Sequence, residues 1–187
     1  MVIVKGKIFF VIGPTASGKT SIVNYILNHR KNTLRAVSYT TREKRNDEIN
    51  GKDYFFVAKE EFLKLIKKRK FIEHSKVYGN YYGTSKYSFS KINEGFDVIK
   101  IIDYKGAKKF KKSKINIVYL FFTPKDIKIL EERLKNRGDK DIKERLKQYK
   151  KEIEFKKECD YYIDTSGNKD LEIENCAKKV IGIMNRL

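Results

Sequence analysis

Apolar residues occur along this chain of 187 residues in short runs and at helical spacings. A run of five, from Ile8 to Ile12, ends at a glycine-containing loop and predicts a buried strand. The apolar positions after the loop are spaced as on one face of a helix, which predicts a helix over about residues 19–30. Further strands are predicted at residues 96–102, 115–122 and 160–163.

Three more helices are predicted in the second half of the chain. The residues Thr123-Pro124-Lys125-Asp126 are typical of a helix start with proline in the first turn, and the helix that follows is expected to bury Ile127, Leu130 and Leu134. A polar break at 136–140 precedes a long charged helix to about residue 157, and a last helix is predicted over 170–186.

The segment from about residue 34 to 90 has a different texture. It is rich in tyrosine and contains short strand-like runs at 34–40, 53–57 and 71–78, with one amphipathic helix over 59–69. Outside it, strands alternate with helices, a pattern that predicts a parallel sheet covered on both faces. The sequence therefore predicts an α/β core interrupted by an inserted, mixed lobe.

Composition supports a globular protein. Apolar residues make up 40% of the chain and charged residues 36%, with only two prolines and eleven glycines. No apolar run approaches the roughly 20 residues that span a bilayer, and the first apolar run is too short for a signal peptide. The cysteines, Cys159 and Cys176, are far apart, which argues against a disulfide framework or a zinc site. We expect a cytoplasmic protein without a membrane partner.

The formal net charge of +19 favours attraction to polyanions at low salt. Most of the positive charge is lysine, which is also the ordinary residue of a solvated surface. Because no arginine-rich tract, zinc finger or RNA-binding aromatic motif accompanies it, we expect no dedicated nucleic-acid partner. Binding to nucleic acid is the alternative interpretation of the same charge.

A phosphate-binding motif follows the first strand. The residues Gly13-Pro14-Thr15-Ala16-Ser17-Gly18-Lys19-Thr20 fit G-x-x-x-x-G-K-[ST] between a strand and a helix, the context that this motif requires. Glycines let backbone N–H groups turn toward phosphate oxygens, and the helix start adds positive potential. We expect Lys19 to reach the β- and γ-phosphates and the Thr20 hydroxyl to ligate Mg²⁺. The alternative, a glycine turn that merely precedes a helix, leaves this pattern unexplained.

The tyrosine-rich segment holds candidates for a second phosphate site. Arg42 and Arg45, three residues apart, match phosphate oxygens with their guanidinium forks, and tyrosine hydroxyls lie nearby. Glu73 lies within an apolar strand, where a carboxylate needs a partner. A guanine base offers two adjacent N–H donors to one carboxylate. A salt bridge to lysine for Glu73 and a solvated loop for the arginines are the alternatives.

Four motifs in this segment resemble those of guanylate kinases: SYTTREKR at 38–45, NGKDYFFV at 50–57, FIE at 71–73 and GNYYGT at 79–84. The resemblance runs nearly from end to end, through DYKG at 103–106, Arg133, Arg137-Gly138 and DYYI at 160–163. It implies an enzyme that transfers the γ-phosphoryl group of Mg-ATP to GMP, and also to dGMP.

The resemblance also implies roles for individual residues. The residues implied to hold the GMP phosphate are Arg42, Arg45, Tyr54 and Tyr82. Those implied to surround or support the guanine are Ser38, Glu73, Thr84 and Asp103. Residues 13–20 are implied to bind ATP, and the catalytic cations are implied to be Lys19, Arg133, Arg137 and Arg145.

The implied fold is a P-loop NTPase-type three-layer α/β/α core with a parallel sheet, an inserted mixed α+β GMP-binding lobe and a short helical lid. The core is expected to comprise residues 1–34 and 93–187, with the lid at about 136–146, and the lobe residues 35–92. We expect a monomer or a weak dimer.

The sequence departs from the family pattern at four places. The loop reads GPTASGKT rather than GPSGxGK, Ile101 stands where the family has an acidic residue, the segment from Arg137 to Arg145 is about three residues short, and Thr165 replaces an asparagine on the adenine side. These departures leave two alternatives besides the nucleic-acid-associated protein: a guanylate-kinase-like binding module with weak catalysis, or a monophosphate kinase of altered base specificity.

Overall fold

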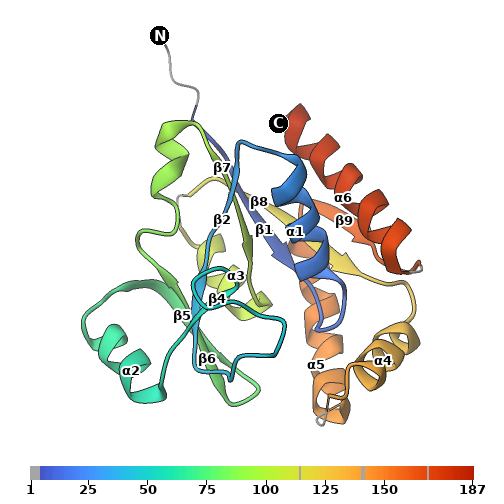
Figure 1. Ribbon diagram of the computed structural model, residues 1–187, viewed down its shortest axis with the longest axis horizontal. Helices are drawn as coiled ribbons and strands as arrows, with labels where there is room; N and C mark the ends of the chain where they lie inside the picture. The colour runs from blue at the N-terminus through green and yellow to red at the C-terminus, as the bar shows by residue number, and fades with distance from the viewer. Residues whose placement is uncertain (1–4, 114, 140–141, 168) are drawn as a thin grey trace.

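Two β-sheets organise the chain. The computed structural model describes residues 5–113, 115–139, 142–167 and 169–187. Five strands form a parallel sheet in the order β2-β7-β1-β8-β9 (Figure 1). These strands are β1 (Ile8–Ile12), β2 (Thr33–Arg35), β7 (Asp97–Ile101), β8 (Ile117–Thr123) and β9 (Tyr161–Asp164).

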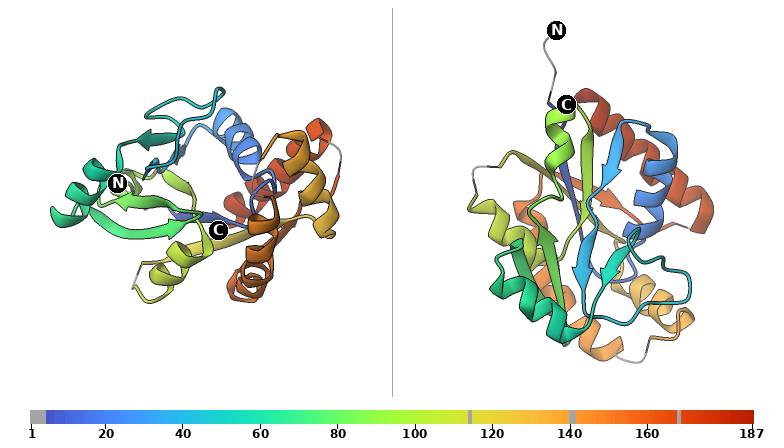
Figure 2. Two further views of the ribbon diagram at one scale, coloured as in Figure 1. Left: turned by 90° about the horizontal axis from the view of Figure 1, so that it is seen from below. Right: turned by 60° about the vertical axis from the view of Figure 1, so that its left-hand side comes forward.

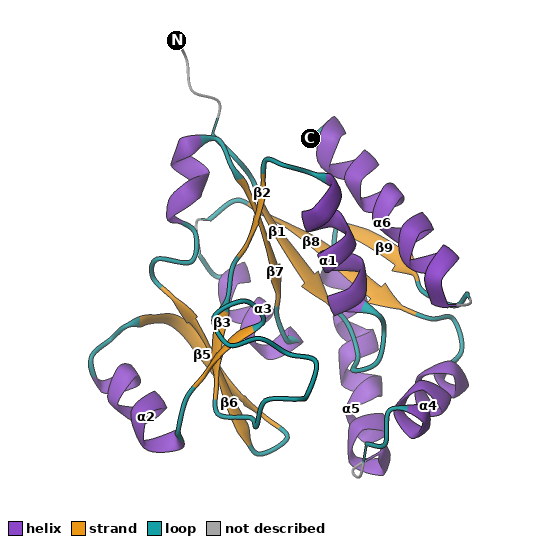
Figure 3. Cartoon of the chain, viewed as in Figure 1, coloured by secondary structure: helices purple, strands orange, loops and turns teal. Residues whose placement is uncertain are grey.

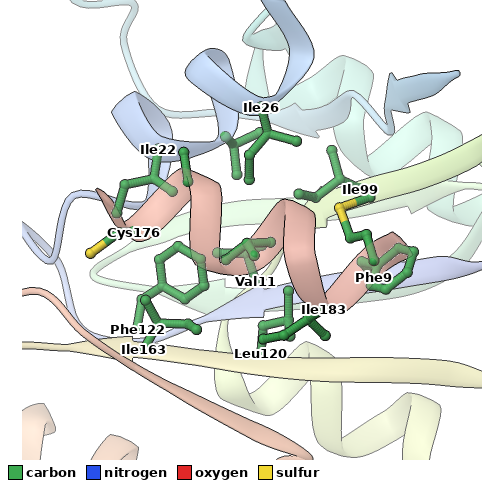
Figure 4. Close-up of a cluster of buried hydrophobic side chains, with 14 residues drawn as sticks. Phe9, Val11, Ile22, Ile26, Ile99, Leu120, Phe122, Ile163, Cys176 and Ile183 are labelled. Carbon is green, nitrogen blue, oxygen red and sulfur yellow. The ribbon is translucent and has the colours of Figure 1, made fainter. Parts of the chain in front are cut away.

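Helices α1 and α6 cover one face of the parallel sheet (Figure 4). Helix α1 (Lys19–His29) buries Ile22, Val23 and Ile26, and α6 (Lys169–Arg186) packs beside it against Phe9 and Leu120. The other face carries α3 (Tyr104–Lys111) and the end of α5 (Ile142–Phe155). The three-layer α/β/α core predicted from the sequence is thus confirmed.

A second, mixed sheet of four strands lies apart from the parallel sheet, in the order β4-β3-β6-β5 (Figures 1 and 3). Its strands are β3 (Ser38–Thr40), β4 (Tyr54–Phe56), β5 (Phe71–Val77) and β6 (Asn80–Ser85), and helix α2 (Lys59–Lys67) packs against it. Strands β3 and β4 are parallel, whereas β6 runs antiparallel to both of its neighbours.

The run at 34–40, predicted as one strand, is divided between the two sheets. Thr33–Arg35 pairs with β7, and Ser38–Thr40 pairs with β4 and β6. Each half therefore completes a different ladder, and the chain crosses between the sheets at residues 36–37.

One predicted helix starts differently in the structure, and one helix was not predicted. Helix α4 (Ile127–Asn136) begins after Asp126, whose carboxylate accepts from the Lys128 amide, and β8 extends through Thr123. The predicted capping residue is therefore the last residue of a strand, and Ile127 at the start of α4 is exposed rather than buried. Helix α3 was not predicted, although Ala107 and Phe110 lie on one helical face.

The lobe formed by the second sheet and α2 has a small aromatic core. The Phe62 ring is fully buried and stacks on Phe71, with ring centroids 4.7 Å apart, and on Tyr81 at 5.5 Å. A Cβ on Gly83 would lie 2.9 Å from this ring, so the strand and the helix are in close contact.

We expect Phe62→Ala to lower the free energy of unfolding by about 3–5 kcal/mol, because it leaves a cavity in a core with few other apolar side chains. Urea denaturation followed by circular dichroism measures the change. Leu63→Ala is the matched control, since Leu63 is next in α2 and 36% exposed. Equal effects of the two substitutions would contradict the importance of the aromatic stack.

No helix within the described ranges is long and apolar enough to cross a membrane.

Candidate active site

A cavity of about 730 Å³ lies at the carboxyl ends of the parallel strands and is lined by residues of the lobe and of α4. The lobe and α4 lie on opposite sides of these strand ends (Figures 1 and 2). The lining of the cavity includes the loop after β1, the loop between β3 and β4, the end of β7 and the start of α5. Ligands of parallel α/β sheets bind at this edge. The cavity lining contains all the predicted site residues except Pro14 and Thr84: Gly13, Thr15, Ala16, Ser17, Gly18, Lys19, Thr20, Ser38, Arg42, Arg45, Tyr54, Glu73, Tyr82, Asp103, Arg133, Arg137 and Arg145.

The loop between β1 and α1 has backbone angles that glycine tolerates best. Gly13 has φ 144° and Gly18, which precedes the first residue of α1, has φ 78°; Ala16 also lies in the left-handed region at φ 62°. A Cβ on Gly13 would lie 2.0 Å from the carbonyl oxygen of Phe122 in β8, so no larger residue fits there. The motif glycines thus serve both the turn and the close approach of the loop to the sheet.

Lys19 curls back over this loop. Its ammonium donates to the carbonyl oxygens of Gly13 (2.8 Å) and Pro14 (2.5 Å) and to Ser17 Oγ (3.3 Å). Burial lowers the pKa of Lys19 to about 8, although the carboxylate of Glu152 opposes the shift. The Lys19 ammonium, held over the phosphate loop at the start of a helix, supplies positive charge at a position suited to anionic phosphate.

Glu152 of α5 is an acidic residue of the cavity that acts on Lys19. It is buried, and burial raises the pKa of its carboxyl, while the Lys19 charge lowers it. Among the described residues, its Oε2 has no hydrogen-bond partner. The Glu152 carboxylate and the Thr20 hydroxyl therefore place oxygen atoms that can ligate a metal ion near the phosphate loop.

Oxygen donors of this kind fit Mg²⁺, which keeps several waters and binds through one or two protein groups together with substrate phosphates. Within the described ranges, no cluster of three or more His, Cys, Asp and Glu side chains could hold a metal ion by itself. The Glu152 carboxylate and the Thr20 hydroxyl thus suit a metal ion that binds together with a triphosphate.

Arg42 and Arg45 lie between β3 and β4. A long loop joins these two strands (Figure 3). Glu48, on the same loop, accepts from Arg42 Nη2 through Oε1 (2.6 Å) and from the Arg45 amide through Oε2 (2.9 Å). Burial lowers the pKa of Arg42, but the hydrogen bond and charge of Glu48 outweigh this and raise it. The Arg42 guanidinium also lies 5.5 Å from the centre of the Tyr54 ring. Glu48 thus orients the Arg42 guanidinium and holds the backbone at Arg45.

Two tyrosines complete this group. The rings of Tyr54 and Tyr82 are 6.0 Å apart, edge to face. Burial, reinforced by Tyr82, raises the pKa of Tyr54 to about 12, so its hydroxyl stays a neutral donor at physiological pH. Together with the arginines it can donate to a phosphate.

At the other end of the lobe, Glu73 is buried in β5 beside Thr84 of β6. The Thr84 hydroxyl donates to Glu73 Oε1 over 2.6 Å, so Thr84 orients the carboxylate from behind the cavity wall. Burial raises the pKa of Glu73, while the Thr84 hydrogen bond and the Lys100 charge lower it. Glu73 Oε2 has no hydrogen-bond partner in the described part of the chain. An oriented carboxylate in a cavity wall suits a ligand with N–H donors.

Asp103 has a structural task as well as a place in the cavity lining. Its Oδ1 caps α3 by accepting from the amides of Lys105 and Gly106, and its Oδ2 accepts from the Ser75 hydroxyl over 2.6 Å. The Asp103 carboxylate is therefore fixed in place by both α3 and the lobe.

The three predicted lid arginines divide into two groups. Arg137 and Arg145 both donate to Thr15 Oγ1 over 3.3 Å, and Asp139 pairs with both of them. Arg133 instead contacts Glu172 of α6 and the Gly167 carbonyl. Residues 140 and 141 of the predicted lid lie outside the described residues.

Arg45 and Arg137 lie close enough for their charges to interact, although one belongs to the lobe and the other follows α4. Burial and the neighbouring charges of Arg137 and Arg42 lower the pKa of Arg45. Like charges held together in a cavity indicate a shared anionic ligand.

Sequence reasoning missed several residues of the site. Glu48, Tyr78, Glu152 and Glu172 line the cavity, and Lys100 lies directly behind it. Lys100 could have been singled out from the sequence, because it is a lone charged residue within the apolar run of a predicted strand. Tyr78, with φ 47° and its ring 4.9 Å from the Arg145 guanidinium, had no comparable sequence signal.

Comparisons with known proteins show which family this chain is similar to. Residues 5–185 match the family model described as "Guanylate kinase". The guanylate kinase of Thermotoga maritima is 40% identical over 96% of this chain and 86% of its own length, and that of Carboxydothermus hydrogenoformans is 42% identical over 90% and 83%. A crystal structure of guanylate kinase from Anaplasma phagocytophilum superposes with a TM-score of 0.80 at 33% identity, covering all of this chain and 88% of the other.

Proposed function

The chain belongs to the guanylate kinase family and is an ATP:GMP phosphotransferase, and we propose that the single cavity described above holds both of its substrates. ATP lies along the loop at residues 13–20, and GMP lies against the lobe. The observation that carries this assignment is that Lys19, Arg42 and Glu73 line one cavity.

The GMP phosphate is bound by the group formed by Arg42, Arg45, Tyr54 and Tyr82. Guanidinium forks donate two parallel hydrogen bonds to phosphate oxygens, and neutral tyrosine hydroxyls add further donors without adding charge. The acceptor phosphate has its second pKa near ~6 and is largely ionised at neutral pH, so its oxygen attacks without a general base.

The guanine base is read by Glu73, with Ser38, Thr84 and Asp103 around it. The carboxylate accepts from the adjacent N–H groups of guanine, whereas adenine presents an acceptor at the same place and leaves a buried charge unpaired. Thr84 keeps the carboxylate aimed at the base.

The phosphoryl group is transferred between the two phosphate sites. Lys19, Arg137 and Arg145 spread the charge of the transferred group, and the position of Arg45 beside Arg137 supports a meeting point of donor and acceptor phosphates there. Arg133, which faces Glu172, supports the donor side. Mg²⁺, held by the Thr20 hydroxyl, would neutralise charge on the ATP phosphates.

A compound that joins adenosine and guanosine through five phosphates tests the single-cavity assignment. We expect it to compete with ATP and with GMP in steady-state kinetics, because it spans both sites. Competition with one substrate only would contradict a shared cavity.

We expect Arg42→Lys to raise the KM for GMP by about 10- to 100-fold, because lysine has no planar fork for two phosphate oxygens. The KM for ATP should change less than about twofold. Initial-rate kinetics at varied GMP measure the effect, and Arg186→Lys, at an exposed position in α6, is the matched control. An equal rise in both KM values would contradict the assignment of Arg42 to GMP.

The proposal also assigns a role to each segment of the chain. Residues 35–92 act as the GMP-binding lobe, residues 1–34 and 93–187 as the phosphate-loop core, and about 136–146 as the lid; residues 1–4, 114, 140–141 and 168 lie outside the described residues. Use of dGMP, a monomeric or weakly dimeric state, a cytoplasmic location and the lack of a dedicated nucleic-acid partner stay predictions.

A further inference from the structure

Lys100 is a charged residue in the hydrophobic core of the parallel sheet. It lies one residue before the end of β7, pairs in register with Phe10 of β1 and is 0% exposed. Burying an ammonium is costly unless nearby groups compensate for its lost hydration. The neighbours of Lys100 therefore indicate what this charge stabilises.

The ammonium connects the core to the lobe. Its Nζ donates to Ser38 Oγ over 2.5 Å, and Ser38 begins β3 of the second sheet and lines the cavity. Because an ammonium only donates, the serine oxygen is the acceptor and the serine keeps its own proton to donate elsewhere. The hydrogen bond thus orients a hydroxyl in the cavity wall.

The charged groups around Lys100 come from three further elements. Glu73 of β5 and Asp103 before α3 are the carboxylates that act on it, and Arg35 of β2 opposes them. Glu73 and Asp103 also repel each other, since the Asp103 charge raises the pKa of Glu73. A cation behind both carboxylates reduces this repulsion.

We propose that Lys100 is a positioning residue for guanine recognition: it orients the Ser38 hydroxyl and supplies the buried positive charge that keeps Glu73 ionised beside Asp103. The inference rests on the proposed role of Glu73 in reading the base. Lys100 is not among the described residues that line the cavity, so it acts through Ser38 and Glu73 and not by touching the nucleotide.

The charge state of Lys100 makes GMP binding depend on pH. Burial lowers the pKa of Lys100 to about 8, although Glu73 and Asp103 oppose the shift. As the pH rises through about 8 the ammonium loses its proton, and GMP binding is expected to weaken. On the acid side, removing Lys100 raises the pKa of Glu73 further, so a variant without this charge loses GMP at a higher pH than the native protein does.

The test is GMP binding to Lys100→Met and to the native protein, measured by calorimetry from about pH 4.5 to 9. Methionine is nearly as long as lysine and apolar. We expect GMP to bind about tenfold more weakly at pH 7, the weakening near pH 8 to disappear and the acid-side loss to move to higher pH. Lys108→Met on the exposed face of α3 removes the same charge from the surface and is the control.

ATP binding separates positioning from a general structural role. Removing one partner from a buried group of charges leaves the others uncompensated and lowers stability, so we expect Lys100→Met to melt below the native temperature, while the folded variant binds ATP within about twofold of native affinity. A folded variant with native GMP binding across the pH range would overturn the proposal, as would equal weakening of ATP and GMP.

A parallel measurement on Glu73→Gln distinguishes this inference from the function on which it rests. Weaker GMP binding to Glu73→Gln but not to Lys100→Met refutes only the role of Lys100. Native GMP binding to Glu73→Gln refutes the assignment of the base reader itself. If Lys100→Met does not fold, the pH dependence of GMP binding to the native protein tests the proposal instead. A GMP affinity that is constant from about pH 7 to 8.5 overturns it.

Discussion

Lys19→Ala is expected to lower kcat by about 10³-fold or more while GMP binding stays within about twofold of the native value. Lys19 is the buried cation of the phosphate loop, and its ammonium lies among the loop oxygens. We expect charge on the transferred phosphoryl group to develop beside this loop, whereas all the proposed GMP contacts except Asp103 belong to the lobe. The substitution therefore removes transition-state stabilisation and leaves the acceptor site intact.

Single-turnover kinetics and calorimetry with GMP measure the two effects separately. Lys31→Ala, at an exposed position just after α1, is the control for the loss of one positive charge. Equal losses of turnover and GMP affinity in a folded Lys19→Ala protein would place the loop and the GMP site differently from this account.

Glu73→Gln is expected to reduce the preference for GMP over AMP by roughly 10³-fold or more. The amide of glutamine keeps the shape of the carboxylate, but it presents a donor to one of the two guanine N–H groups. Most of the loss should fall on kcat/KM for GMP, while the KM for ATP stays near its native value.

The ratio of kcat/KM for GMP to that for AMP measures this preference. Glu61→Gln, on the exposed side of α2 in the same lobe, provides the matched control. An unchanged ratio in Glu73→Gln would sink the assignment of Glu73 as the base reader.

The phosphate loop and the layered core could be predicted because local patterns determine them. The loop motif lies between a strand and a helix in the sequence, and the structure keeps it there, with Gly13 and Gly18 at positive φ. The apolar runs of β1, β7 and β8 became the centre of the parallel sheet. The alternation of strands and helices was enough to predict the fold class.

Some residues that the sequence did not reveal depend on contacts between distant segments. Glu152 looks like an ordinary surface carboxylate in its polar surroundings, and only the folded chain brings it to Lys19. Glu48 is six residues from Arg42 on the same loop, and their contact depends on the conformation of that loop. Helix α3 was missed because its eight residues hold four lysines. Its start is set by the Asp103 cap, whose hydrogen bonds to the Lys105 and Gly106 amides appear only in the structure.

Ile101 stands where the family pattern has an acidic residue, and its surroundings explain in part why an apolar side chain fits there. Its half-buried side chain packs against the core cluster beneath α1 and α6, and it also lines the cavity. The carboxylates of the cavity wall are supplied from other elements, by Glu48, Glu73, Asp103, Glu152 and Glu172. The site therefore retains acidic groups although residue 101 is apolar.

The most direct test of the account is the release of ADP from Mg-ATP in the presence of GMP, dGMP, AMP, CMP or UMP. The account predicts rapid turnover with the guanine nucleotides and little with the others, because the Glu73 carboxylate pairs only with the guanine N–H groups. Comparable turnover with AMP, or no turnover with any monophosphate by a folded protein that binds GMP, would contradict it.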